Sequence, residues 1–244
     1  MRPSFVIDAT PEAARLYRET HAIVAVDVFR ATTVIVTALA CGHPIYPVAS
    51  VEEAETVAGN LHDPLLAGEQ AGIKPDGFHL NNSPAAIEKL TNCRPIVLVT
   101  SAGTKLLSEA RGASSIYVAS LRNIIATAAQ LVGSHRRVAL IGAGTHGKPR
   151  PEDQFACARI AELLCGQGYM PENERTVAEL ARWHGVPVRA MRDSPSVDFL
   201  RESNQLDDVD FTLSHVDDVD ASAVFNGQQV SLVLPGAVRL LAEA

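Results

Sequence analysis

The sequence predicts an α/β fold of three layers (α/β/α), in which helices cover a mostly parallel mixed sheet and a hairpin closes the chain. Short runs rich in Val and Ile alternate with segments of helical length, as in proteins built from βαβ units. Near the end, Asn226 and Gly227 separate two short strand-like runs, which favours a type I′ hairpin. Hydrophobic residues make up 47% and aromatic residues only 5%, so we expect a core of aliphatic side chains.

The apolar runs define the expected strands. The run at residues 22–27 is continuous and ends in a carboxylate, as buried parallel strands often do. The other strands are expected at residues 4–8, 44–48, 63–67, 96–100, 115–118, 137–141, 222–225 and 230–234.

Capping signals define the expected helices. Thr10 is a candidate N-cap followed by proline, Gly42 ends the second helix, and Ser50 begins a capping box with Glu53. The helices are expected at residues 11–19, 32–41, 51–58, 121–132 and 151–165, with another beginning near Gly103.

The domain organisation predicted for residues 1–244 is a single α/β domain with a helical insertion at about residues 170–215. The alternation of strands and helices ends after Gly168, where three helices are expected in succession, at residues 172–183, 196–202 and 207–214. A chain of 244 residues is long enough to bury a sizeable core.

Charge and cysteine usage limit the partners and the compartment. The net charge is −7 and no block of Lys and Arg occurs, so no nucleic-acid partner is expected. No apolar run is long enough to cross a membrane. No signal-peptide pattern precedes the cysteines and none forms a CxxC pair, so we expect reduced core cysteines and a cytoplasmic protein; these residues are Cys41, Cys93, Cys157 and Cys165.

The first motif with chemical potential is DVFRATT at residues 27–33, where a buried strand gives way to a helix. Ligands of open α/β sheets bind at the carboxyl ends of strands. Asp27 can hold a hard cation or position water, and Arg30 can bind an oxyanion through two hydrogen bonds. Thr32 or Thr33 can cap the helix, whose free N–H groups attract phosphate. The alternative is structural, with Asp27 capping the helix and pairing with Arg30.

The second motif begins at Gly68 and Glu69, again after a strand, and leads into a long polar loop at residues 70–83. A loop of this length is more often functional than idle. Glu69 can bind a metal ion, and Asn82 and Ser83 can donate hydrogen bonds to phosphate. The alternative is a turn followed by an N-cap at Ser83.

The third motif, TSAGT at residues 100–104, lies between a strand and a helix. Ser101, Gly103 and Thr104 are small enough to let backbone N–H groups approach an anion. An ordinary helix cap is the alternative.

The fourth motif, GAGTHG at residues 142–147, matches the G-x-G-x-x-G pattern of dinucleotide-binding proteins. In those proteins the helix begins within the glycines, whereas Pro149 and Pro151 place its start after them. We therefore interpret the segment as a long loop that faces an anion.

Charged residues follow this loop directly. Lys148 and Arg150 supply positive charge, and Glu152 and Asp153 stand in the first turn of the next helix. The two acids can bind a metal ion, although carboxylates are favoured at this end of any helix.

The last acidic group is Asp207, Asp208 and Asp210, for which a solvated helix face is the simpler interpretation. The histidines form no HxH, HxxH or HExxH pattern, so a zinc site is not expected. No G-x-S-x-G nucleophile motif is present either.

Taken in order, these motifs resemble the 2-phosphosulfolactate phosphatase family over nearly the whole chain from about residue 20. The segments that carry the resemblance are residues 26–33, 68–69, 77–78, 82–84, 152–153, 157–158 and 207–211. The chain departs from the family pattern at Gln70, where an arginine is common, and at Ser101 and Ala102, where the family usually has Thr-Asn.

The resemblance implies a mixed α/β/α fold and a requirement for Mg²⁺. It also implies hydrolysis of 2-phosphosulfolactate to 3-sulfolactate and phosphate, a reaction that can feed coenzyme M biosynthesis. The expected catalytic residues are Asp27, Glu69 and Asp153. The expected metal ligands are these three with Glu152 and Asp208. The expected substrate-binding residues are Arg30, Thr32, Thr33, Asn82, Ser83, Ser101, Gly103 and Thr104.

Two alternative functions stay open. One is a phosphatase of the same fold that acts on another small anionic phosphoester. The other is a non-catalytic protein that binds an anion or a nucleotide, although added carboxylates would weaken anion binding. A homodimer is an open expectation, and a nicotinamide-linked oxidoreductase rests on the glycine pattern alone.

Overall fold

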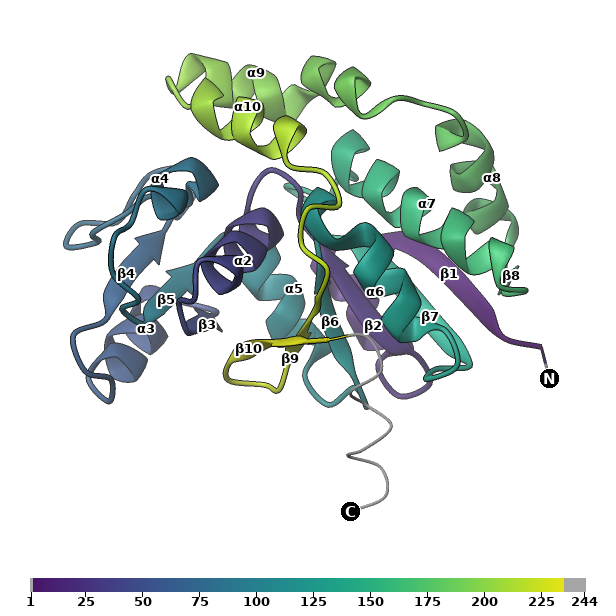
Figure 1. Cartoon of the computed structure of the whole chain (residues 1–244), viewed down its shortest axis with the longest axis horizontal. Coiled ribbons are helices and arrows are strands. Elements are labelled where there is room, and N and C mark those ends of the chain that lie inside the picture. The colour runs from purple at the N-terminus through teal and green to yellow at the C-terminus, as the bar shows by residue number, and fades with distance from the viewer. Residues whose placement is uncertain (1, 235–244) are drawn as a thin grey trace.

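The computed structural model describes residues 2–234, and within them ten strands form one sheet in the order β4-β5-β3-β10-β9-β6-β2-β7-β1-β8 (Figure 1). The strands are β1 (Ser4–Ala9), β2 (Ala22–Val26), β3 (Ile45–Val48), β4 (Leu65–Gly68), β5 (Ile96–Val99), β6 (Ile116–Ala119), β7 (Arg137–Gly142), β8 (Met170–Pro171), β9 (Ser222–Phe225) and β10 (Val230–Val233).

The sheet consists of two parallel blocks joined by an antiparallel hairpin. Strands β4, β5 and β3 form one block, and β6, β2, β7, β1 and β8 form the other. The hairpin of β9 and β10 pairs antiparallel with β6 on one side and β3 on the other. This arrangement confirms the predicted mixed, mostly parallel sheet with antiparallel C-terminal strands.

Helices cover both faces of the sheet. The α-helices are α1 (Ala14–Tyr17), α2 (Ala31–Ala40), α3 (Val51–Ala58), α4 (Pro84–Glu88), α5 (Gly103–Ala110), α6 (Ile124–Leu131), α7 (Pro151–Gly166), α8 (Glu174–Trp183), α9 (Pro195–Glu202) and α10 (Leu206–Ser214), with 3₁₀ turns at η1 (Pro11–Ala13), η2 (Leu121–Asn123) and η3 (Val188–Asp193).

The alternation of side chains along β2 shows how the layers form. Ile23 and Ala25 face a core shared with α2, α4 and α5. Val24 and Val26 point to the opposite face, where α6 and α7 pack. Three layers result, as predicted.

The segment predicted to be an insertion contains α8, η3, α9 and α10. Helix α8 packs against α7 and β1, whereas α10 packs against α4 and α9 (Figure 1). In Figure 1, α9 and α10 form the upper edge of the molecule. The description of this segment as an insertion within one domain stays a prediction.

Two local predictions are wrong. Thr10 does not cap a helix through its side chain, because its φ is 73° and residues 11–17 form a 3₁₀ turn followed by the short α1. The hairpin is present, but only Gly227 of the expected pair has a positive φ, so the turn is not type I′ across Asn226 and Gly227. Instead, the Asn226 side chain accepts hydrogen bonds from the N–H groups of Gln228 and Gln229.

The predicted cap at Ser50 is confirmed, whereas the prediction of buried cysteines is only partly correct. Ser50 accepts a hydrogen bond from the Glu53 N–H and caps α3, as expected. All four cysteines are free thiols, but only Cys157 is buried, so the expectation of core cysteines is wrong for Cys93 and Cys165, which are exposed.

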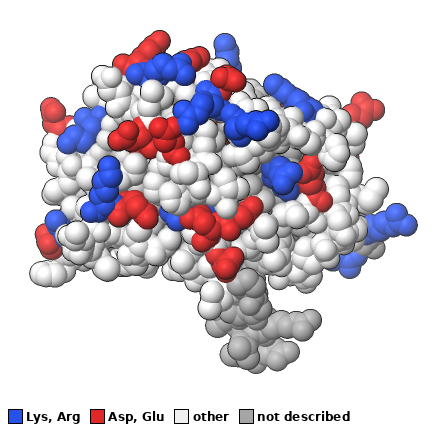
Figure 2. All heavy atoms as spheres, turned by 45° about the horizontal axis from the view of Figure 1, so that its top comes forward, with Lys and Arg blue, Asp and Glu red and all other residues white. Residues whose placement is uncertain are grey.

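The surface charges and the hydropathy of the helices concern binding to nucleic acid and to membranes. Figure 2 shows acidic and basic side chains interspersed on the face that includes the upper edge of Figure 1. Within residues 2–234, no helix combines the length and apolar character that a membrane span requires.

The hairpin that joins the two blocks gives a stability prediction. Phe225 on β9 is buried in the core, whereas Leu232 on β10 is partly exposed. We expect Phe225→Ala to lower the free energy of unfolding by about 3–5 kcal/mol, because it leaves a cavity. Leu232→Ala, the matched control, should cost less than about 1 kcal/mol. Urea denaturation measures both, and equal losses would contradict the proposed role of the hairpin.

Candidate active site

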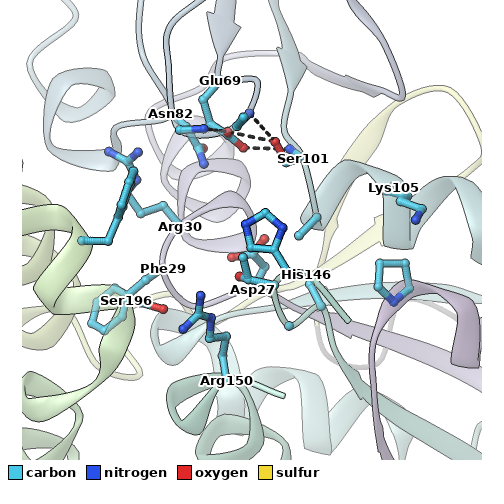
Figure 3. A pocket seen from close by; sticks show the side chains of 18 of the residues that line it. Asp27, Phe29, Arg30, Glu69, Asn82, Ser101, Lys105, His146, Arg150 and Ser196 are labelled. Atoms are coloured by element: carbon cyan, nitrogen blue, oxygen red, sulfur yellow. Dashed lines mark hydrogen bonds between the residues drawn. The ribbon is translucent and has the colours of Figure 1, made fainter. Parts of the chain in front are cut away.

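A cavity of about 430 Å³ lies at the carboxyl ends of several strands. Its wall includes Asp27 after β2, Glu69 after β4, Ser101 after β5 and Ala143 after β7. Ser196 of α9 also lines the cavity, and Figure 3 shows it beside Arg150. Strands β2 and β5 are far apart in the sheet order, but α5 packs against both β2 and β3 and brings the two blocks together. The predicted edge of the sheet is therefore the one that carries a cavity.

Asp27 lies between the start of α2 and the start of α5. Its carboxylate accepts a hydrogen bond from the N–H of Ala31. A Cβ atom on Gly103 would lie 2.6 Å from Asp27 Oδ2 and 2.4 Å from the Cβ of Ala31. Gly103 is therefore required for space beside Asp27, and its predicted contact with an anion stays a prediction.

Glu69 connects the long loop to the end of β5. Its carboxylate accepts hydrogen bonds from the N–H of Ser101 at 2.7 Å, from the Ser101 hydroxyl at 3.0 Å and from the N–H of Gly72 at 2.6 Å. The preceding Gly68 has a φ of 137°, and a Cβ there would lie 1.9 Å from the carbonyl oxygen of Val99. Only glycine fits this position, which turns Glu69 into the site.

Asp153 and Glu152 stand in the first turn of α7 and are both buried. Asp153 accepts hydrogen bonds from the N–H groups of Val28 at 2.8 Å and Gly144 at 3.1 Å, so it fastens the loop after β7 to the end of β2. Glu152 differs, because its Oε2 is buried without a hydrogen-bond partner among the described residues.

The four carboxylates form one electrostatic unit, which we call the acidic cluster (Asp27, Glu69, Glu152 and Asp153). Burial raises the pKa of Asp27 to about 7, and Glu69 and Glu152 add to the rise, while the Ala31 hydrogen bond and Arg30 oppose it. Burial and the charges of Asp27 and Glu152 also hold the pKa of Asp153 well above its ordinary value. Ionising the whole cluster without a counter-charge is therefore unfavourable.

Arg30 and Asp208 form a buried ion pair, with 2.6 Å between Arg30 Nη1 and Asp208 Oδ2. The other Asp208 oxygen accepts hydrogen bonds from the Ser83 hydroxyl at 2.5 Å and the Ala85 N–H at 3.3 Å. Asp208 is therefore placed with Arg30 and not with the acidic cluster. The interpretation of Asp208 as part of a solvated helix face is therefore wrong. The alternative in which Asp27 pairs with Arg30 is wrong as well, because Arg30 pairs with Asp208.

The predicted hydroxyl groups divide into two sets. Those of Thr32, Thr33 and Thr104 are buried and donate to backbone carbonyl oxygens, each at 2.8 Å. Ser83 caps α4 by accepting a hydrogen bond from the N–H of Ala86. Only Ser101 of these hydroxyl residues lines the cavity.

The cavity wall contains both expected and unexpected residues. Asn82 was expected there, and its Oδ1 is buried without a partner in the described chain. The glycine pattern ends in a loop whose His146 lines the cavity, and α7 begins at Pro151, after the glycines, as predicted. The unexpected wall residues are Phe29, Lys105, Ser196 and Phe199, whereas Arg150 was expected to supply positive charge beside an anion. No sequence signal pointed to those of α9, because the amphipathic pattern of a surface helix is the same whether or not the helix lines a cavity.

The donor set is compatible with Mg²⁺. In residues 2–234, no three His, Cys, Asp or Glu side chains are grouped as a self-sufficient metal site. Mg²⁺ does not need such a cage, because it binds through one or two carboxylates and completes its shell with water and phosphate oxygens. Asp27, on the cavity wall, and Glu152, whose charge acts on Asp27 and whose Oε2 has no partner in residues 2–234, are the candidates for that smaller requirement.

Comparison with known proteins agrees with this geometry. A profile of the 2-phosphosulpholactate phosphatase family matches residues 8–222. The chain belongs to this family. The match extends from the end of β1 into β9 and therefore includes every strand end that lines the cavity. It confirms the resemblance seen in the ordered motifs.

Individual family members are similar over different lengths. A protein of Carboxydothermus hydrogenoformans is 34% identical over 203 residues, which is 78% of this chain and 85% of that protein. Proteins of Symbiobacterium thermophilum and Clostridium tetani are 40% and 38% identical over 59% and 56% of this chain, and the matches span 63% and 59% of their own lengths. Each of the three is named "probable 2-phosphosulfolactate phosphatase".

The close approach of α5 to Asp27 in this family member gives a test of the site geometry. We expect Gly103→Ala to lower the free energy of unfolding by about 1–3 kcal/mol, because the new Cβ overlaps Asp27 and Ala31. Gly166→Ala is the matched helical control, since nothing lies within 4 Å of its Cβ, and it should be neutral or stabilising. Thermal unfolding compares the two, and a fully stable Gly103→Ala would show that this packing is wrong.

Proposed function

We propose that this chain is a Mg²⁺-dependent phosphatase that hydrolyses 2-phosphosulfolactate to 3-sulfolactate and phosphate. The observation that carries the proposal is the acidic cluster, which is buried beside a cavity in a chain of the matching family. A cytoplasmic location, the absence of a nucleic-acid partner, a homodimer and a link to coenzyme M biosynthesis stay predictions.

The need for a cation follows from the charges. Buried carboxylates that repel one another are stabilised when a divalent ion replaces the proton that they would otherwise share. Asp27 and Glu152 would hold the ion, and Glu69 and Asp153, whose oxygens are occupied by backbone N–H groups, would keep the surrounding loops in place. When bound, Mg²⁺ would neutralise phosphoryl charge and favour attack at phosphorus.

The chain's own groups suit the rest of the reaction. During hydrolysis a water oxygen bonds to phosphorus, the ester P–O bond breaks, and a proton must reach the leaving oxygen. In the metal-free site burial and neighbouring carboxylates raise the pKa of Asp27 to about 7, so near neutral pH a bound cation can replace its proton, and the carboxylate would then act as a ligand. The attacking water loses a proton, which balances the proton that the leaving oxygen takes up. Asn82 lines the same cavity, and its side-chain NH₂ group can donate to the phosphoryl oxygens, whereas the N–H and hydroxyl of Ser101 already donate to Glu69.

A second candidate is a phosphatase of the same fold for another small anionic phosphoester. This candidate is supported by the ion pair of Arg30 with Asp208, because the residue expected to bind the acidic group of 2-phosphosulfolactate already has a partner. A non-catalytic anion-binding role is disfavoured, since buried carboxylates repel an anion.

Phosphate release from 2-phosphosulfolactate tests the proposal. We expect activity with Mg²⁺, loss of activity in EDTA, and a decrease of at least about 100-fold in Asp27→Asn, because the variant removes a carboxylate ligand of the cation. Asp207→Asn, at an exposed position on α10, is the matched control and should keep wild-type activity. Full activity of Asp27→Asn, or activity that survives metal removal, would rule out this mechanism.

The raised pKa of Asp27 also predicts how stability depends on pH. Between about pH 4 and about pH 7 the folded protein retains a proton that the unfolded chain has lost, so stability decreases as the pH rises. At about pH 8 in EDTA, Asp27→Asn should therefore be more stable than wild type by at least about 1 kcal/mol.

Thermal unfolding across this pH range measures the difference. Below about pH 4 the two proteins should converge, because Asp27 is then protonated in both the folded and the unfolded state. Mg²⁺ should raise the unfolding temperature of wild type at about pH 8 and have a smaller effect on the variant. A variant that is less stable than wild type at every pH would contradict the charge crowding described above.

A further inference from the structure

We propose that Arg150 binds the acidic group of the substrate that is not transferred, and so selects phosphoesters that carry a second anionic group. This inference rests on the proposed phosphatase function and assigns a recognition residue to it. Arg150 is the N-cap residue of α7 and lines the cavity, next in sequence to the helix whose first turn holds Glu152 and Asp153.

The contacts of Arg150 set it apart from a structural arginine. Its Nε is buried with no hydrogen-bond partner, and no ion pair joins its guanidinium to any carboxylate within residues 2–234. Figure 3 shows the guanidinium directed between Ser196 and Asp27. A buried donor without a partner is unfavourable unless a ligand completes it.

The other basic side chains on the wall are already neutralised. Arg30 is paired with Asp208, and Lys105 with Glu12, where 2.6 Å separates Lys105 Nζ from Glu12 Oε1. Arg150 is thus the arginine or lysine of this wall with no acidic partner in the described part of the chain. An incoming anion would not have to displace a protein carboxylate from it.

The chemistry of guanidinium fits this role. Arginine presents parallel N–H donors that match the paired oxygens of a carboxylate or a sulfonate. The acidic cluster and its cation account for the phosphoryl end of the ester, so Arg150 can compensate the charge at the other end. The assignment of substrate recognition therefore moves from Arg30 to Arg150.

Truncated esters separate the groups that Arg150 can recognise. 2-Phosphosulfolactate carries both a carboxylate and a sulfonate, 2-phospholactate lacks the sulfonate, the phosphate ester of 2-hydroxyethanesulfonate lacks the carboxylate, and ethyl phosphate lacks both. Arg150→Gln should lower kcat/KM for 2-phosphosulfolactate by about 10- to 100-fold, mainly through KM, and should change ethyl phosphate hydrolysis only a few-fold. An ester that lacks the group recognised by Arg150 should be hydrolysed equally well by wild type and Arg150→Gln. The group missing from that ester is therefore the one that Arg150 binds.

Two further variants make the test specific. Arg150→Lys keeps the charge but not the paired donors, so its loss should be smaller than that of Arg150→Gln. Lys148→Gln removes a positive charge from the same loop at an exposed position away from the cavity wall and should behave as wild type. The proposal is overturned if Arg150→Gln retains wild-type selectivity, or if it loses activity equally on all four esters.

Calorimetric binding of 3-sulfolactate in the presence of Mg²⁺ distinguishes failure of this inference from failure of the proposed function. If no ester is hydrolysed, the phosphatase proposal fails, but Arg150→Gln should still bind 3-sulfolactate at least about 10-fold more weakly than wild type and Lys148→Gln. Equal binding by the three proteins, or no binding by wild type, would overturn the role of Arg150.

Discussion

Crowding of buried carboxylates is the constraint on which the rest of the structure depends. Burial and neighbouring carboxylates, Glu152 among them, raise the pKa values of both Asp27 and Asp153. The fold offsets part of this rise with backbone N–H groups, from Ala31 to Asp27 and from Val28 and Gly144 to Asp153. The remainder is the energetic basis of the proposed cation requirement, and selection for function would preserve such a cluster even if it destabilises the metal-free protein.

The packing of α5 brings these groups together. Glu69 and Asp27 follow strands of different parallel blocks, which an antiparallel hairpin separates in the sheet order, but α5 packs against β2 of one block and β3 of the other. The buried contact of Arg30 and Ser83 with Asp208 then connects the start of α2 and the long loop to α10. Partners separated by 125 and 178 residues thus hold the segment above the sheet beside the cavity.

Local patterns predicted much of this molecule, whereas partners distant in sequence could not be predicted. Strand runs and the rule that ligands bind at strand ends identified Asp27, Glu69 and Asp153 as residues that converge, because each simply follows or faces the end of a strand. The roles of the threonines were beyond such patterns, since a hydroxyl that bonds its own backbone and one that binds a ligand have the same sequence signature. The partner of Arg30 likewise depends on tertiary packing, which no local signal encodes.

The charge balance of the cavity suggests an order of events. In a chain with a net charge of −7, an anionic ester that approached the acidic cluster without a cation would meet repulsion from Asp27 and its neighbours. One unpartnered guanidinium cannot offset four carboxylates, so Arg150 alone would hold the ester weakly and without fixing the phosphoryl group. With a cation in place, the cation and Arg150 would present two positive charges, and a substrate with two anionic groups could pair with both. Selectivity would then come from the second anionic group, which a simple phosphate ester lacks.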